Sequence, residues 1–143
     1  MVFGDDETQC SFAYQVVARD CYVLVMQSGR PLAEAKVLQW RDDIEAALRR
    51  VKTTRVVFDE RDKQASPPWV DAMIWSWLAS HARLARAAFI HNTRAEVYRT
   101  MARATRGFRG IAMPWVEQVE IMAFVAEQDA VDWVCAEPLA QPA

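Results

Sequence analysis

The order of hydrophobic patterns along the chain constrains its fold more than any other feature. Two runs rich in aromatic and β-branched residues, Phe12 to Ala18 and Tyr22 to Met26, are separated only by Arg19, Asp20 and Cys21. Such a pair of runs predicts a β-hairpin. After the hairpin, segments with apolar residues every three or four positions alternate with short apolar runs, as helices alternate with strands. The chain is therefore expected to build an α/β sheet.

The remaining segments define the predicted topology. After Gly29, the spacing of Ala33, Val37, Trp40 and later apolar residues as far as Val51 predicts a long amphipathic helix. Further strands are predicted at 54–59, 86–91 and 119–125, and further helices after Ser66, from about Arg94 to Arg106, and at 128–134. The order β-β-α-β-α-β-α-β-α predicts a mixed, mostly parallel five-stranded sheet flanked by helices, with right-handed crossovers.

The length of the chain suits one compact domain, because 143 residues can bury a full core. We expect a flexible acidic N-terminus at 1–10, the domain at 11–136 and a frayed tail at 137–143. No uncharged apolar run approaches the roughly 18 residues that a membrane-spanning helix needs. The sequence therefore predicts no transmembrane segment.

The three cysteines, Cys10, Cys21 and Cys135, are odd in number and widely spaced. This spacing offers neither a closed disulfide framework nor a CxxC metal knuckle, so we expect reduced cysteines. The N-terminus carries acidic residues and lacks the basic start and apolar core of a secretory signal. Together these features predict a cytoplasmic protein.

The two histidines, His81 and His91, are the first candidates for catalysis because histidine is the usual general base near neutral pH. His81 falls on the apolar stripe of a predicted helix, and His91 ends a predicted strand. The sequence has no GxSxG nucleophile turn, no HExxH pair, no acidic calcium loop and no glycine-rich phosphate loop. We therefore expect structural histidines, no catalytic residue, no metal site, no cofactor and no enzymatic activity.

Polar residues follow the predicted strand at 54–59, at the sheet edge where ligands of α/β proteins commonly bind. Asp59, Glu60, Arg61 and Asp62 are predicted to form a loop at this edge, which either contacts a ligand or is a solvated, self-paired turn. Ser66 precedes Pro67 and Pro68 and is predicted to cap the next helix. The alternative is that Ser66 is a phosphorylation site, where a phosphate would add about two negative charges.

Charge is uneven along the chain although the formal net charge is only −2. Arg99, Arg103 and Arg106 fall on one face of a predicted helix and form a basic stripe. The stripe is either a solvated outer face or a contact for an anionic membrane or an acidic partner. A pI near 5.7 and the lack of basic residues interleaved with aromatic ones argue against nucleic acid.

Six tryptophans are a high number for a chain of this length. Trp75 lies well to the side of the apolar stripe that contains Ile74 and Trp77, which predicts an exposed side chain. Trp69 and Trp115 lie near predicted helix or loop edges. These tryptophans either form an interface or pocket, with methionines supplying an adaptable surface, or fill the core.

The hairpin followed by strand–helix alternation, the segment TRVVFDERD at 54–62 and the ending IMAFVAEQDAVDWV at 121–134 resemble the STAS/Sec14-like group that includes SpoIIAA-like proteins. In that group a final strand with Phe leads into a short helix that carries an acid, an Ala and a Trp, matched here by Phe124, Asp129, Ala130 and Trp133. The resemblance covers 12–134. It implies a mixed sheet flanked by helices and non-catalytic binding of protein partners or of lipid-like ligands.

One branch of that group carries a phosphorylatable serine in an Asp-Ser-Ser-Gly-like turn after the central strand. Only Ser66 lies near this position here, and two prolines follow it. The sequence is more similar to the stand-alone SpoIIAA-like branch. The main hypothesis is a regulatory domain that binds a protein partner, or a second copy of itself as a homodimer, through an apolar surface with tryptophan. The alternatives are a module for a lipid or small apolar ligand and a peripheral membrane protein.

Overall fold

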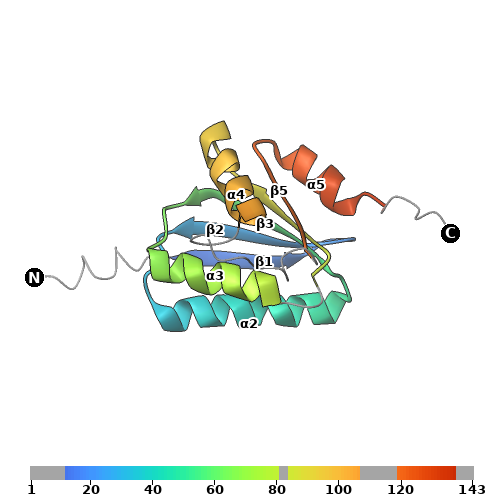
Figure 1. Cartoon of the computed structure of the whole chain (residues 1–143). Coiled ribbons are helices and arrows are strands. Elements are labelled where there is room, and N and C mark those ends of the chain that lie inside the picture. The colour runs from blue at the N-terminus through green and yellow to red at the C-terminus, as the bar shows by residue number, and fades with distance from the viewer. Residues whose placement is uncertain (1–11, 81–83, 107–118, 138–143) are drawn as a thin grey trace, which may run out of the picture.

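The structure, a computed structural model, describes residues 12–80, 84–106 and 119–137 (Figure 1). Its elements follow the predicted order, which is confirmed. They are β1 (Ala13–Ala18), β2 (Val23–Gly29), α2 (Glu34–Val51), β3 (Arg55–Lys63), α3 (Pro68–Ser80), β4 (Arg86–Ile90), α4 (Arg94–Arg106), β5 (Glu120–Phe124) and α5 (Glu127–Cys135).

The five strands form one mixed sheet in the order β1-β2-β3-β4-β5. The hairpin strands β1 and β2 are antiparallel, and β2, β3, β4 and β5 are parallel. Each helical crossover therefore moves one strand along in the same direction. Right-handed crossovers of this kind place their helices on the same face of the sheet. The mostly parallel five-stranded sheet predicted from the sequence is confirmed.

The two faces of the sheet bury cores of different size. The larger core lies between the sheet and helices α2 and α3, with apolar side chains of α4 packed against it. Trp40 of α2, Phe58 of β3 and Trp77 of α3 are among its buried residues. The smaller core lies on the opposite face, where α5 packs Ala130 and Val134 onto strand residues. Figure 1 shows α2 and α3 side by side, away from α5.

Polar and covalent contacts hold α5 against its face of the sheet. Arg61 pairs with Glu127 in the first turn of α5 at 2.8 Å. Arg86 donates hydrogen bonds to the backbone oxygens of Trp133 and Ala136 near the other end of the helix. A disulfide also joins the β1–β2 connection to the last residue of α5.

That disulfide, between Cys21 and Cys135, corrects the expectation of reduced cysteines. The two residues are 114 positions apart in sequence, and the fold brings their Cα atoms to 6.0 Å, within the usual range for a disulfide. Spacing along the sequence could not reveal a pair that only the packing of α5 creates. The cytoplasmic location stays a prediction, without the support of the cysteine argument.

The sequence predicted a loop from Asp59 to Asp62. These residues instead belong to strand β3, which continues to Lys63. The prediction failed because these residues are charged, and strand propensity depends strongly on context. Here the neighbouring strand supplies that context: Ser28 and Gly29 of β2 pair with Asp62 and Lys63 after a register shift. Backbone pairing therefore extends the strand by five residues beyond Phe58, the last residue of its apolar part.

Helix α3 begins later than predicted. The backbone oxygen of Pro67 accepts hydrogen bonds from the N–H groups of Val70 and Asp71, so Pro67 occupies the N-cap position. Pro68 is the first helical residue, where a proline loses no hydrogen bond. Ser66 precedes the cap, and its hydroxyl accepts a hydrogen bond from Lys63 at 2.8 Å. The prediction that Ser66 caps this helix is therefore wrong.

None of the described helices is both long and apolar enough to cross a membrane. The predicted N-terminal tail at 1–10 lies outside the described residues, as does the C-terminal tail apart from Glu137. His81, Cys10 and Trp115 also lie outside them.

Candidate functional site

A pocket of about 270 Å³ opens at the carboxyl edge of β3 and β4, between α3 and α4. In a parallel sheet this edge is where ligands most often bind. Charged and polar side chains make up most of the lining, over a floor formed by Trp75 and Phe89. The lining residues are Glu60, Lys63, Gln64, Ala65, Ser66, Asp71, Ile74, Trp75, Phe89, His91, Glu96, Arg99, Thr100 and Arg103.

The alternation of β3 divides the candidate residues of that strand between the two faces of the sheet. Asp59 and Arg61 point toward α5: Arg61 donates two hydrogen bonds to the Asp59 carboxylate, at 2.9 and 2.7 Å, and also pairs with Glu127. These hydrogen bonds lower the pKa of Asp59. Glu60 points to the opposite face and lines the pocket. Asp62 is exposed. The four residues therefore do not form one site.

His91 is buried at the end of β4, beside the pocket floor. Its Nε2 atom lies 2.7 Å from the Thr100 hydroxyl, and its Nδ1 atom lies 3.9 Å from a Glu60 carboxylate oxygen. Burial lowers the pKa of His91, although Glu60 opposes that shift. The ring is therefore neutral at pH 7. The nearby carboxylate favours a proton on Nδ1, so that Nε2 accepts the Thr100 hydrogen.

The His91 ring lies between the Thr100 hydroxyl and the Glu60 carboxylate, as the base of a catalytic triad lies between its nucleophile and its acid. The geometry of these three side chains does not suit catalysis. A separation of 3.9 Å between Nδ1 and the carboxylate is longer than a hydrogen bond. Thr100 is also buried within helix α4. This arrangement fixes the orientation of the His91 ring, which stacks on Phe89.

The arginines of the basic stripe on α4 differ in their contacts. Arg103 pairs with Asp71 of α3 at 3.0 Å and so links the two helices. Arg99 lines the pocket and has no ion-pair partner among the described residues. The side chain of Arg106 lies outside the described part of the structure. Contact with an anionic membrane through these three arginines stays a prediction.

Trp75 does not lie where its spacing predicted. Trp75 is only 6% exposed and stacks on Phe89, so the prediction of an exposed side chain is wrong. Trp77, on another side of the helix, contacts Trp40 of α2 and donates a hydrogen bond to Glu45. The helix buries two sides because it packs against both α2 and the sheet. Trp69, in contrast, is 42% exposed.

The remaining side of α3 faces solvent and carries no exposed charge. We call it the α3 outer face: Pro68, Trp69, Ala72, Met73, Ser76 and Ser80, of which Ala72 and Met73 are half-buried. The one charged residue of the helix, Asp71, lines the pocket and is paired with Arg103. In α2, five of the eight exposed residues are charged. Helices α4 and α5 also expose charged residues, among them Arg94 and Glu127.

Two solved structures share this architecture. One, from Shewanella loihica PV-4, is an uncharacterized protein of the DUF3478 family with a SpoIIAA-like fold; it is 20% identical, with a TM-score of 0.59 over 87% of this chain and 94% of its own. The other is the anti-sigma factor antagonist SpoIIAA in its unphosphorylated form, 17% identical, with a TM-score of 0.56 over 85% of this chain and 96% of its own. This chain has a SpoIIAA-like fold. No protein-family model and no curated protein matches the sequence.

Within this SpoIIAA-like fold, the sequence revealed some pocket residues and not others. Of the candidate residues that the sequence offers after the third strand, Glu60 and Ser66 line the pocket. Lys63 and Thr100 were missed, because their approach to the pocket depends on the extended β3 and on the packing of α4. Among the described residues, no cluster of three or more His, Cys, Asp or Glu side chains suits a metal ion.

Proposed function

We propose that this SpoIIAA-like chain is a non-enzymatic recognition domain that binds a protein partner through the α3 outer face. The observation that carries the proposal is the absence of exposed charge on this face, around a half-exposed Trp69. The partner is a protein that presents a complementary apolar and uncharged surface. Of the three tryptophans proposed from the sequence as interface residues, the α3 outer face carries Trp69, whereas Trp75 is buried.

The composition of the α3 outer face fits the centre of a protein interface. Interface centres are depleted in charged residues and enriched in tryptophan and methionine. Trp69 and Met73 are one turn apart on the helix and belong to the same face. A tryptophan that becomes buried on binding is a common source of interface energy. Plain solubility would favour charged residues here, as on the outer face of α2.

The fold also supports a regulatory role. SpoIIAA, which shares the fold, is described as an anti-sigma factor antagonist. We propose the regulatory role by analogy with that protein, because a shared fold alone does not determine function.

The two alternative functions receive less support from the described residues. A site for a lipid or other apolar ligand needs mainly apolar walls, whereas the pocket is lined mostly by charged and polar groups. Membrane binding through the arginine stripe is weakened by the pairing of Arg103 with Asp71. Salt-sensitive binding to anionic liposomes that is lost when Arg99, Arg103 and Arg106 are replaced by glutamine would favour the membrane alternative.

Site-specific photo-crosslinking tests the proposal. A photoreactive phenylalanine analogue is placed at Ser76, on the α3 outer face, and at Ala46, an exposed residue of α2, as the matched control. We expect a discrete protein adduct from position 76 and none from position 46. The crosslinked protein is then purified, and its dissociation constant is measured with the unmodified chain and with Trp69→Ala.

The proposal predicts that Trp69→Ala weakens binding by about 2 kcal/mol or more, as for an interface hot spot. If the crosslinked protein is a second copy of the chain, sedimentation at increasing concentration should show self-association that Trp69→Ala abolishes. Equal crosslinking from both positions, or unchanged affinity of Trp69→Ala, would contradict the proposal.

A further inference from the structure

Three acids and three cations line the pocket, and one carboxylate–cation ion pair joins them among the described residues. Each of the three acidic residues has a partner: Asp71 pairs with Arg103, and Glu60 accepts a hydrogen bond from Gln27. The third, Glu96, accepts a hydrogen bond from the Thr93 hydroxyl at the start of α4, where a carboxylate is favoured by the helix dipole.

Two of the three cationic side chains in the pocket lack a carboxylate partner. Lys63 donates a hydrogen bond to the Ser66 hydroxyl, which is uncharged and leaves two of the three ammonium hydrogens available. Arg99 forms no ion pair within the described part of the chain. Lys63 comes from β3 and Arg99 from α4, so the two cations reach the same pocket from different elements. Both side chains therefore keep N–H donors for a charge-assisted hydrogen bond to an anionic group.

We propose that this pocket binds a small anionic molecule through a carboxylate or phosphate group held by Lys63 and Arg99. The site is separate from the α3 outer face and so does not depend on the proposed partner. The Ser66 hydroxyl, already bonded to Lys63, is placed to donate its hydrogen to the same anionic group.

The rest of the pocket defines the size and character of the ligand. A volume of about 270 Å³ is just below the range of sites for drug-sized ligands, so the pocket suits a small metabolite and excludes a folded macromolecular segment. Trp75 and Phe89 provide a stacked aromatic floor. The ligand is therefore expected to combine an oxyanion with a compact apolar or planar part.

Nuclear magnetic resonance titration of the full chain provides the test. Four probes are added in turn: inorganic phosphate, phenyl phosphate, benzoate and benzamide, the last being a neutral analogue of benzoate. We expect saturable shifts of the Trp75 indole N–H and the Arg99 Nε–H with phenyl phosphate and benzoate. Benzamide should bind at least about tenfold more weakly than benzoate, because it lacks the negative charge. Stronger binding of phenyl phosphate than of benzoate would identify phosphate as the preferred group, and the reverse would identify carboxylate.

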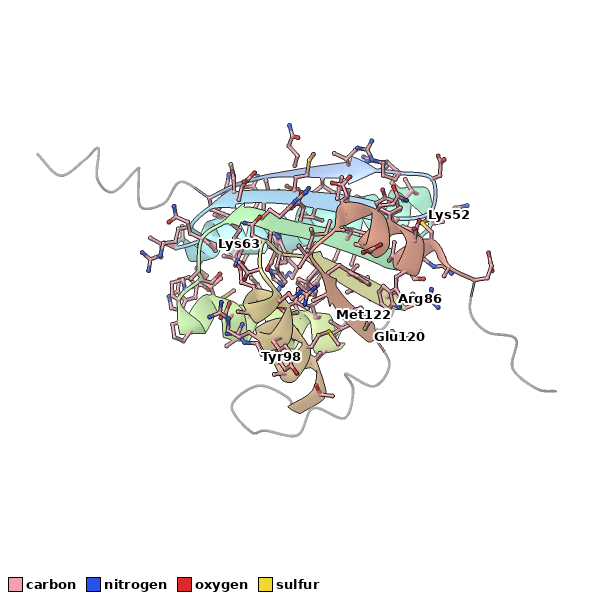
Figure 2. All side chains as sticks on the ribbon, turned by 90° about the horizontal axis from the view of Figure 1, so that it is seen from above. Lys52, Lys63, Arg86, Tyr98, Glu120 and Met122 are labelled. Atoms are coloured by element: carbon pink, nitrogen blue, oxygen red, sulfur yellow. A yellow bond between two sulfur atoms is a disulfide. The ribbon has the colours of Figure 1, made fainter. Side chains whose placement is uncertain are left out.

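The variants Lys63→Gln and Arg99→Gln should each weaken binding of the better anionic probe by about tenfold. The matched controls are Lys52→Gln, at the other end of the molecule from Lys63 in Figure 2, and Arg94→Gln, which lies on α4 but does not line the pocket. The controls should keep the affinity of the parent chain. Absence of saturable binding, equal binding of benzoate and benzamide, or unchanged affinity of the two pocket variants would overturn the proposal.

Discussion

Helices α2 and α3 lie side by side on the same face of the sheet, yet their outer faces differ in kind. Most exposed residues of α2 are charged, whereas none of the exposed residues of α3 is. Both helices bury tryptophans in the same core, where Trp40 and Trp77 meet edge to face. The difference is therefore confined to the solvent side and does not arise from the packing of the core.

The fold determines the residues on the buried sides of α2 and α3 and leaves those on their outer sides free to vary. The buried sides of both helices must match the sheet and each other, which fixes their apolar residues. The outer sides carry no such requirement, and a soluble domain usually fills them with charge. The proposed contact with a partner would account for an uncharged outer face with Trp69 at its start.

The largest expected effect is a loss of stability when a tryptophan on the buried side of α3 is replaced, compared with one on its outer face. Trp77→Ala should lower the free energy of unfolding by about 3–5 kcal/mol, because it opens a cavity and removes the hydrogen bond to Glu45. Trp69→Ala should cost less than about 1 kcal/mol, because Trp69 is half-exposed. Urea unfolding followed by circular dichroism measures both. A comparable loss for Trp69→Ala would mean that this residue serves the fold instead of an interface.

A smaller effect on stability is expected from His91, which lines the pocket beside α3, and this effect depends on pH. Because the pKa of buried His91 lies below its ordinary value of 6.5, the unfolded chain binds a proton first as the pH falls. The contribution of His91 to stability is thus present above pH 6.5 and is lost as the pH falls through the lower pKa of the folded state. Urea unfolding at a series of pH values should show this loss. His91→Gln should remove it, and an unchanged pH profile in that variant would contradict the assignment.

Sequence patterns predicted the fold well because each helix and strand has a strong local signature. The spacing of apolar residues in the helices and the apolar strand runs sufficed for the element order, and the hairpin, the segment 54–62 and the final strand and helix carried the family resemblance. Charged strand residues and the Cys21–Cys135 pair were missed, because both depend on segments that only the folded sheet brings together. The exposure of Trp75 was misjudged for the same reason: a helix packed on two sides has a buried arc wider than one stripe.

A still smaller effect tests the link between α3 and α4. Asp71→Asn removes the ion pair with Arg103, whose side chain is 42% exposed, so stability should fall by less than about 1 kcal/mol. The loss should shrink at high salt, because screening weakens the original pair. Thermal unfolding at low and high salt measures it. A loss that does not change with salt would show that Asp71 acts through packing instead of charge.

The smallest effect on stability is expected from adding charge to either outer face. Ser76→Glu on α3 and Ala46→Glu on α2 both alter exposed residues, so each should change the free energy of unfolding by no more than about 0.5 kcal/mol. Equal urea midpoints for the two variants would show that the α3 outer face plays no part in folding. A large loss for Ser76→Glu alone would indicate that the face is packed against the chain itself.

The same pair of variants gives the most direct test of recognition through α3. The measurement is the dissociation constant of the purified partner for the parent chain, Ser76→Glu and Ala46→Glu, by titration calorimetry. We predict that a buried, unpaired carboxylate at position 76 weakens binding by at least about tenfold, while position 46 leaves it unchanged. Equal affinity of the two variants would contradict the assignment of the α3 outer face as the binding surface.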